Sequence, residues 1–283
     1  MPEIAYVNGE FLPLERAMVH VEDRGYQFAD AVYEFIRTYG GRPFAVAEHL
    51  QRLFFSLDAI GLKHDFTTAQ LESLIHEAIR RAAFPEAGVY LQVSRGQAKR
   101  HRGIPAHYAP TLVITVRALA STAHLCSTGI QLITVPDQRW GRCDLKTVGL
   151  LANVLAYQAA QQAGANDAVF CDAAGTVHEA TAGNIFIVTA AGQVATPAKS
   201  CRLLAGVTRD KLLQAAVAAG FPTAERHITR TELLASAEVI LTSSTTEVVP
   251  VLAVDGQPIG PGQPGPVTAR LYRQFMRQFA GPT

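Results

Sequence analysis

The sequence predicts an α+β protein of two domains, and three observations support this. The first 118 residues read as strands and two helices in the order strand, helix, helix, strand, which is typical of a compact α+β unit. Residues 119–123 are small and polar, and we expect them to link that unit to residues 124–283, which would form the C-terminal domain and carry Lys146. Strands and short helices mix there without a regular βαβ rhythm, which disfavours a doubly wound sheet.

The elements of residues 1–118 follow from local patterns. Residues 5–12 alternate around Asn8-Gly9, the dipeptide that most readily supplies two positive φ angles, so a hairpin is expected. Residues 31–39 are rich in β-branched and aromatic side chains and predict a strand. Similar reasoning predicts a polar loop at 23–30, helices at 47–57 and from the Thr67 cap to Ile79, and strands at 89–95 and 111–117.

The C-terminal part is expected to open with a strand at 130–135. An apolar helix should follow at 150–163 and end near Gly164. The patterns further predict strands at 167–171, 184–188 and 238–241, and helices at 208–219, 230–234 and 266–279.

Composition narrows the class of partner. The 283 residues are 48% hydrophobic and 17% charged, which gives ample material for a core. A net charge of +1 without basic runs argues against nucleic acid and anionic membranes, so a small-molecule partner is expected. Four scattered cysteines form no C-x-x-C pair and read as free thiols, with no metal site expected. Without a signal peptide or an apolar run of ~20 residues, a cytoplasmic location is expected.

Lys146 stands where an arginine-rich segment becomes apolar and helical, within residues 139–153. An amine partly desolvated beside a helix start is suited to covalent chemistry. A lysine that merely snorkels from a helix end is the simpler alternative, and the residues elsewhere must decide between the two readings.

Glu179 lies among small residues just before an apolar strand, where a flat ligand could come close. An ionised, partly buried acid there could pair with a protonated heterocyclic nitrogen, whereas a capping or surface glutamate is the common alternative. Hydroxyl residues at 242–246 follow a strand, and Val207 and Thr208 open a helix. Amides and hydroxyls at such ends hold phosphate, and Arg52 could add charge.

A lysine, a separate carboxylate and hydroxyl-rich phosphate cradles together are what pyridoxal 5′-phosphate requires. Competing signatures are missing: the sequence has no G-x-G-x-x-G after a strand, P-loop, G-x-S-x-G or H-E-x-x-H.

With these residues in place, the sequence resembles the class IV, or fold-type IV, pyridoxal-phosphate-dependent aminotransferases, and among them the D-amino-acid (D-alanine) aminotransferases. The resemblance covers nearly the whole chain and implies two α/β domains with the cofactor in the cleft between them, in a homodimer. It rests on residues 6–9, 23–28, 32–34, 48–53, 139–153, 179–184, 206–209 and 243–250.

The resemblance also implies residue roles. Lys146 would bind the cofactor covalently and move the substrate proton, and Glu179 would keep the pyridine nitrogen protonated. The remaining roles would be phosphate binding by Arg52, Val207, Thr208 and Ser244, packing on the ring face by Leu204, and lining of the substrate pocket by Tyr33. Transamination would be ping-pong, with a 2-oxo acid such as 2-oxoglutarate collecting the nitrogen.

Substrate choice is where the resemblance loosens. Val32-Tyr33-Glu34 matches the D-amino-acid branch, but in the loop that should grip the α-carboxylate Arg100 holds the arginine place while Arg102 replaces a histidine. One alternative is that the two arginines clamp the carboxylate, with their side chains reaching across a dimer interface. The other is that both are solvated loop charges. Ala182 and Gly183 occupy places where hydroxyls are common in the family.

Alternative functions on the same fold stay open at this point. They are a branched-chain L-amino-acid transaminase, an (R)-amine transaminase and an aminodeoxychorismate-type lyase. A protein that binds pyridoxal phosphate without turnover is the least favoured, because both the lysine and the acid are present.

Overall fold

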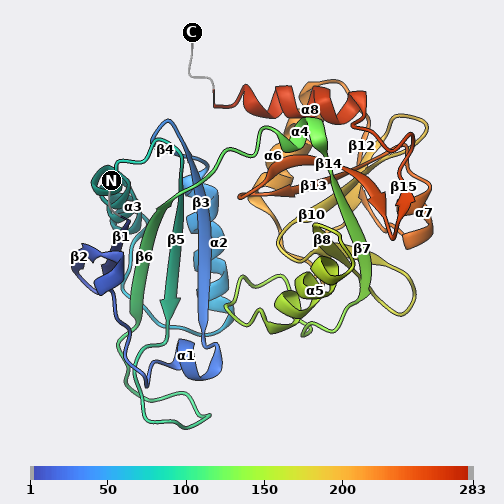
Figure 1. Cartoon of the computed structure of the whole chain (residues 1–283). Helices are drawn as coiled ribbons and strands as arrows, with labels where there is room; N and C mark the ends of the chain where they lie inside the picture. The colour runs from blue at the N-terminus through green and yellow to red at the C-terminus, as the bar shows by residue number, and fades with distance from the viewer. Residues whose placement is uncertain (1–2, 280–283) are drawn as a thin grey trace. The chain divides into compact units, whose positions relative to one another are not determined.

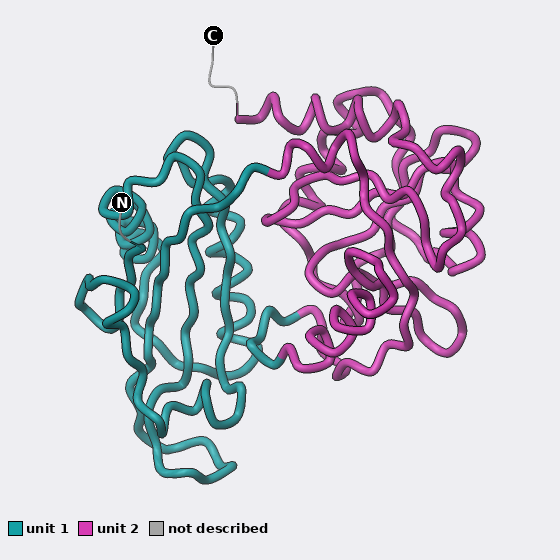
Figure 2. Tube along the Cα trace, viewed as in Figure 1, with its two compact units in different colours: residues 1–121, 145–149 teal, residues 122–144, 150–283 magenta. Residues whose placement is uncertain are grey.

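The computed structural model describes residues 3–279 and divides the chain into two compact units (Figure 2). Unit 1 comprises residues 1–121 and 145–149, and unit 2 comprises residues 122–144 and 150–283. The principal division thus falls inside the segment expected as a linker. The short insertion 145–149, however, groups with unit 1, whereas the sequence placed Lys146 in the C-terminal domain.

Unit 1 is built on a six-stranded sheet of order β2-β1-β6-β5-β3-β4, in which every pairing is antiparallel (Figure 1). The strands are β1 (Ile4–Val7), β2 (Glu10–Pro13), β3 (Ala31–Tyr39), β4 (Arg42–Pro43), β5 (Ala87–Ser94) and β6 (Thr111–Ala118). The helical elements are η1 (Leu14–Arg16), α1 (Arg24–Phe28), α2 (Val46–Ala59) and α3 (Thr68–Ala82).

The hairpin and the long helices of unit 1 form for the reasons expected. Asn8 and Gly9 have φ angles of 44° and 109°, as the tight turn between β1 and β2 requires. Thr67 and Gln70 form a capping box at the start of α3. The apolar faces of α2 and α3 share one core with alternate residues of β3, β5 and β6.

Helix α1 is a correction to the polar loop expected at residues 23–30. The Asp23 side chain accepts from the Gly25 amide at 2.8 Å and caps the helix, and Ala29, in the left-handed region with a φ of 56°, ends it. Five residues are too few to show helical periodicity, so the sequence pattern could not reveal this helix.

Residues 145–149 group with unit 1 because they pair with the start of β3. The Tyr33 amide donates to the Lys146 carbonyl at 2.9 Å, and the Val148 amide donates to the Ala31 carbonyl at 3.2 Å. An isolated antiparallel bridge joins Val32 to Thr147. This pairing continues the edge of the sheet beyond the short strand β4.

Unit 2 is a nine-stranded mixed sheet of order β12-β11-β10-β13-β14-β7-β8-β9, with β15 paired to β14. The β14–β7, β7–β8 and β11–β12 pairs are parallel. The strands are β7 (Ile130–Pro136), β8 (Asp167–Cys171), β9 (Val177–Ala180), β10 (Asn184–Val188), β11 (Val194–Pro197), β12 (Thr223–Arg226), β13 (Glu238–Ser243), β14 (Glu247–Val254) and β15 (Gln257–Pro258). The helices are α4 (Leu125–Thr128), α5 (Leu151–Gln162), α6 (Val207–Ala218), α7 (Arg230–Leu234) and α8 (Pro266–Met276).

Most of the elements predicted for unit 2 are present, several with the expected bounds. The pattern missed the short helix α4 and the strands β9, β11, β12, β14 and β15. Within residues 3–279 no helix is long and apolar enough to cross a membrane. The same residues hold no group of three or more metal-ligating side chains placed to bind an ion.

Candidate active site

The residues that the sequence singled out fall into two groups, one in each unit. Unit 1 holds Tyr33, Arg52, Arg100, Arg102 and Lys146. Unit 2 holds Glu179, Leu204, Val207, Thr208 and Ser244.

Lys146 is held through its backbone and lies against Tyr33. Its amide donates to Ser56 Oγ at 3.3 Å, and its carbonyl accepts from the Tyr33 amide. Its Nζ lies 4.3 Å from the centroid of the Tyr33 ring, within range of a cation–π contact. Helix α5 begins at Leu151, one residue after the start expected from the sequence, so Lys146 precedes it by five residues while its backbone pairs with β3.

Tyr33 is in turn supported from the neighbouring strand. Its ring stacks on that of Tyr90 with centroids 5.3 Å apart. The Tyr90 hydroxyl donates to Gln92 Oε1 at 2.6 Å, and burial raises the pKa of Tyr90. Lys146 therefore faces an aromatic ring that a second, stacked ring holds in place.

Arg52 is oriented by Glu34, a residue to which the sequence assigned no role. Glu34 is fully buried and accepts from Arg52 Nε at 2.7 Å, Arg52 Nη2 at 2.8 Å and His49 Nδ1 at 2.7 Å. Burial alone would raise the pKa of Glu34, but Arg52 and His49 outweigh it and lower the pKa to about 2. Burial lowers the pKa of His49, so the neutral ring donates its Nδ1 proton.

The sequence did contain a signal for this pair. Glu34 alternates with Val32 and Ile36 on the buried face of β3, and an acid at such a position requires a partner. The bidentate contact fixes the plane of the Arg52 guanidinium.

Glu179 lies at the centre of a polar cluster in unit 2. It sits on β9, where no strand was predicted, and only 6% of it is exposed. Its Oε2 accepts from the Leu204 amide at 3.0 Å and from Asn184 Nδ2 at 3.2 Å. Asn184 Nδ2 also donates to the Leu204 carbonyl at 2.9 Å, so the segment with the expected ring-packing residue is fastened to the acid.

Arg139 is a further member of this cluster that sequence reasoning left without a role. Its Nη1 donates to Glu179 Oε1, while Nε and Nη2 each donate to buried Asp137 at 3.0 Å. Its Cζ lies 4.2 Å from the Phe170 ring centroid. Burial alone would raise the pKa of Asp137, but the hydrogen bonds and charge of Arg139 outweigh it and lower the pKa.

The start of α6 offers backbone amides to an anion. Gly206 is the N-cap residue, no side chain in the described part of the chain caps this helix, and Thr208 is buried in its first turn. A Cβ at Gly206 would lie 2.0 Å from Asn184 Oδ1, so glycine is needed for the approach of the amide that serves Glu179. An uncapped helix N-terminus of this length fits a phosphate group.

Ser244 lies in the turn between β13 and β14. The turn is fixed by Ser243, whose Oγ accepts from the amides of Thr245 at 3.2 Å and Thr246 at 2.9 Å. Gly183 stands where a hydroxyl residue is common in the family, and sterics explain the glycine, because a Cβ there would lie 2.6 Å from the Thr242 carbonyl oxygen. The hydroxyl residue common in the family does not fit this backbone.

Arg100 and Arg102 are exposed and lie in the loop between β5 and β6. The Arg100 Cζ lies 4.7 Å from the Phe28 ring centroid, and its Nη1 donates to the Gln27 carbonyl at 3.4 Å. Helix α1, which carries Gln27 and Phe28, therefore supports one of the two loop arginines.

Comparison with known proteins gives one consistent result at the level of family. Residues 31–254 match the model of the amino-transferase class IV family. A D-alanine aminotransferase of Bacillus licheniformis is 39% identical over 276 residues, which cover 98% of this chain and 97% of the relative. One from Listeria monocytogenes is 36% identical and covers 96% of this chain and 95% of the relative.

Similar solved structures come from another branch. The branched-chain amino acid aminotransferase of Escherichia coli superposes with a TM-score of 0.91 at 26% identity, covering all of this chain and 96% of that one. A second branched-chain amino acid aminotransferase, that of T.th. with pyridoxamine 5′-phosphate, gives a TM-score of 0.90 at 26% identity, covering 98% of this chain and 94% of that chain.

Proposed function

Because the chain belongs to the class IV aminotransferases, which depend on pyridoxal 5′-phosphate, we propose that it moves the amino group of a D-amino acid such as D-alanine to a 2-oxo acid. The observation that carries this proposal is the nearly full-length match at 39% identity to a D-alanine aminotransferase. The similar branched-chain structures support the fold and the cofactor, but at 26% identity they weigh less on the choice of substrate.

The chain's own residues fit the cofactor in three respects. A buried, hydrogen-bonded acid, Glu179, suits the ring nitrogen, and Leu204, fastened to it, suits packing on the ring face. Uncapped amides at Val207 and Thr208 suit the phosphate, with Arg52 and Ser244 as further donors. When bound, the cofactor supplies an electron sink for the carbanion formed at the substrate Cα.

Lys146 would hold the cofactor covalently and, once displaced by the substrate, carry the proton from Cα. Its backbone is fixed on both sides by Ser56 and Tyr33, so only the side chain needs to move. The Tyr33 ring beside Nζ would limit the approach of water and line the substrate pocket. Arg100 and Arg102 would bind the α-carboxylate through forked donors. A ping-pong sequence follows, because one site must accept first the amino donor and then the 2-oxo acid.

A stereoselective half-reaction screen tests this function. Holoenzyme is mixed with D-alanine, L-leucine or (R)-1-phenylethylamine, and loss of the absorbance of the lysine-bound cofactor is followed. Fastest loss with D-alanine, and regeneration by 2-oxoglutarate or pyruvate, is the expected result. Faster loss with L-leucine would instead establish the branched-chain alternative, and loss with the amine alone would establish an amine transaminase.

Two controls complete the screen. Lys146→Ala should lack the absorbance of the lysine-bound cofactor and show no turnover, whereas turnover equal to the parent would exclude Lys146 as the catalytic lysine. A parent protein that binds the cofactor but reacts with no donor would be a binding protein and would overturn the proposal.

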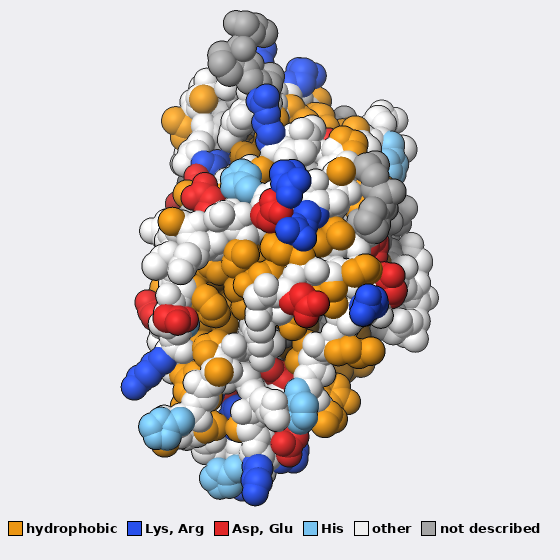
Figure 3. Space-filling model, turned by 90° about the vertical axis from the view of Figure 1, so that its left-hand side faces the viewer, with side chains coloured by type: hydrophobic (Ala, Val, Ile, Leu, Met, Phe, Trp, Pro, Cys, Tyr) orange, Lys and Arg blue, Asp and Glu red, His pale blue; other side chains and the backbone are white. Residues whose placement is uncertain are grey.

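We further propose that the chain acts as a homodimer. Apolar side chains gather on one face of the molecule among charged ones (Figure 3). On α5, Leu151 is 71% exposed, Val154 58% and Leu155 61%, and such apolar exposure along one helix is typical of an interface. In unit 1, the exposed apolar residues include Met18, Val19, Val21, Tyr26 and Ile104. Light scattering of the parent and of Leu155→Glu tests the proposal: the parent should have twice the mass of one chain and the variant should dissociate, whereas a monomeric parent would refute it.

A further inference from the structure

Helix α1 fastens the loop that carries Arg100 and Arg102. We call residues 97–110 the arginine loop. At its start, the Arg24 amide donates to the Gly96 carbonyl at 2.9 Å, and the Ala98 amide donates to the Glu22 carbonyl at 3.2 Å. In its middle, Arg24 Nη1 donates to the carbonyls of His101 at 2.7 Å and Gly103 at 3.3 Å. These two carbonyls flank Arg102, so Arg24 fixes the backbone from which that side chain projects.

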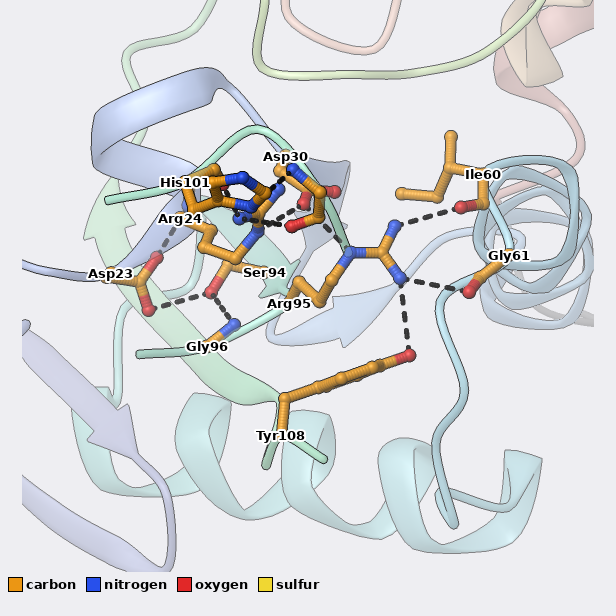
Figure 4. Close-up of polar contacts among 12 residues, drawn as sticks. Asp23, Arg24, Asp30, Ile60, Gly61, Ser94, Arg95, Gly96, His101 and Tyr108 are labelled. Carbon is orange, nitrogen blue, oxygen red and sulfur yellow. Dashed lines mark hydrogen bonds and ion pairs between the residues drawn. The ribbon is translucent and has the colours of Figure 1, made fainter. Parts of the chain in front are cut away.

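Arg24 is itself fixed by a half-buried carboxylate, that of Asp30 (Figure 4). It is 4% exposed, and its Nε donates to Asp30 Oδ2 at 2.8 Å. Arg95 Nε donates to the same oxygen, also at 2.8 Å. Burial alone would raise the pKa of Asp30, but the hydrogen bonds from Arg95 and Arg24 outweigh it and lower the pKa. Asp30 therefore stays ionised and holds both guanidinium groups.

Arg95 extends this network to the other end of the loop. It is 2% exposed, and its guanidinium donates to the carbonyls of Ile60 and Gly61 at 2.9 Å each and to the Tyr108 hydroxyl at 3.2 Å. Tyr108 lies near the end of the arginine loop, and its hydroxyl accepts from the Lys63 amide at 2.7 Å. Both ends and the middle of the loop are thus tied to one charged cluster.

The ring of Phe28 connects α1 to the other arginine. The Cζ atoms of Arg24 and Arg100 lie 4.9 and 4.7 Å from its centroid. A planar guanidinium over an aromatic face keeps its orientation better than one in solvent. The same short helix therefore constrains the backbone beside Arg102 and the side chain of Arg100.

We propose that Arg24 is a positioning residue that sets the direction in which the arginine loop presents Arg100 and Arg102 to the substrate carboxylate. The role of the carboxylate rests on the proposed function, whereas the anchoring of the loop does not. The proposal gives a task to the segment 23–28, which carried part of the family resemblance without any assigned role.

The test compares holoenzyme variants in two measurements. Arg24→Met removes the guanidinium donors and keeps the approximate length of the side chain, and Asp30 keeps its hydrogen bond from Arg95. Phe28→Leu removes the ring beside Arg100, Arg24→Lys restores a cation, and Arg117→Met is a matched control on β6, where the parent side chain is 62% exposed. Limited trypsin digestion reports cleavage after Lys99, Arg100 and Arg102. Steady-state kinetics report KM and kcat for D-alanine, with (R)-1-phenylethylamine as a donor that lacks a carboxylate.

Arg24→Met should increase loop cleavage about 10-fold or more, because the loss of charge-assisted hydrogen bonds frees the middle of the loop. KM for D-alanine should rise by a similar factor with a smaller change in kcat. Arg24→Lys should recover part of both effects, and Phe28→Leu should raise KM for D-alanine. Arg117→Met should leave both loop cleavage and KM unchanged. The rate of Arg24→Met with the amine should equal that of the parent. Cleavage and KM equal to those of the parent would overturn the proposal, as would an equal loss with D-alanine and the amine.

Failure of the proposed function would be distinct from failure of this inference. If the parent reacts with no amino donor, the proposed function is refuted, and the rates of trypsin cleavage alone decide whether Arg24 anchors the loop. Faster cleavage in Arg24→Met would then support the anchor, and unchanged cleavage would remove it.

Discussion

Replacing Glu34 by Gln should cost stability in a manner that depends on pH. The substitution keeps the shape of the side chain but removes the charge that pairs with Arg52 and accepts from His49. The pKa of Glu34 falls from 4.5 to about 2 in the fold, and at about 1.4 kcal/mol per pKa unit this corresponds to ~3 kcal/mol. The loss expected when one partner of a buried ion pair is removed, roughly 3–5 kcal/mol, is of the same size.

The direction of the pH dependence follows from the sign of the shift. The folded-state pKa lies below the unfolded-state value, so the stabilisation is complete above about pH 5 and is lost as the pH falls towards 2. Urea unfolding of the parent and of Glu34→Gln should therefore differ by ~3 kcal/mol at pH 7, by roughly 1–2 kcal/mol at pH 3, and converge near pH 2. Affinity for pyridoxal phosphate should also fall, because the plane of the Arg52 guanidinium is no longer fixed.

An exposed pair provides the matched control. Glu77 accepts from Arg80 and Arg81 and its pKa is also lowered to about 2, but it lies on the outer surface of α3. Glu77→Gln should change stability little, because solvent and salt screen an exposed pair. Equal effects of the two substitutions, or a Glu34→Gln effect that is the same at pH 7 and pH 3, would refute the reasoning.

Three further outcomes are expected. Arg139→Met removes the cation beside Glu179, so cofactor affinity and kcat should each fall about 10-fold or more, as measured by absorbance titration and turnover. Unchanged affinity would contradict a role of Arg139 in holding Glu179. Gly206→Ala places a Cβ where Asn184 Oδ1 lies, so cofactor affinity should fall while the far-ultraviolet circular dichroism spectrum is retained, and a normal affinity would show that the asparagine can move. Burial raises the pKa of the Cys143 thiol from 9.0 to about 11, so its thiolate at pH 8 is ~100-fold scarcer, and iodoacetamide labelling followed by mass spectrometry should be correspondingly slow; labelling at the rate of a free thiol would contradict this burial.

The elements that the sequence revealed are those whose local pattern and tertiary environment agree. The hairpin at Asn8-Gly9, the capped helix after Thr67 and the apolar strand at residues 184–188 each carry their own signal. Strand β14 was missed although it lies near the middle of its sheet. Pro250 interrupts its apolar run, and a proline argues against a central strand. Its partner β13 precedes it across a short turn, whereas its other partner, β7, comes from a distant part of the chain. Strands of four residues, such as β9, are too short for a periodic pattern.

The candidate site was predicted in its residue types but not in its supporting contacts. Lys146 and Glu179 were singled out because a lysine and an acid in unusual contexts are visible in a sequence. Arg139 and Glu34 were given no role, because their importance lies in pairings with residues up to 40 positions away. The same is true of Arg24, whose carbonyl partners lie 77 and 79 residues along the chain. Long-range pairing of this kind is a property of the folded backbone.

The pairing of residues 145–149 with β3 has a consequence for how the protein can be dissected. A fragment cut after Ser121 would lack the segment that covers the Tyr33 amide and would expose a strand edge, which invites aggregation. Unit 1 is therefore not an independent domain that can be moved to another protein. Two separately expressed fragments, 1–121 and 122–283, should restore activity only if the second fragment pairs its residues 145–149 with β3 of the first. Permuted chains with new termini in the surface turn at Gly40-Gly41 would keep that segment in place, whereas a break at residue 144 or 150 would not.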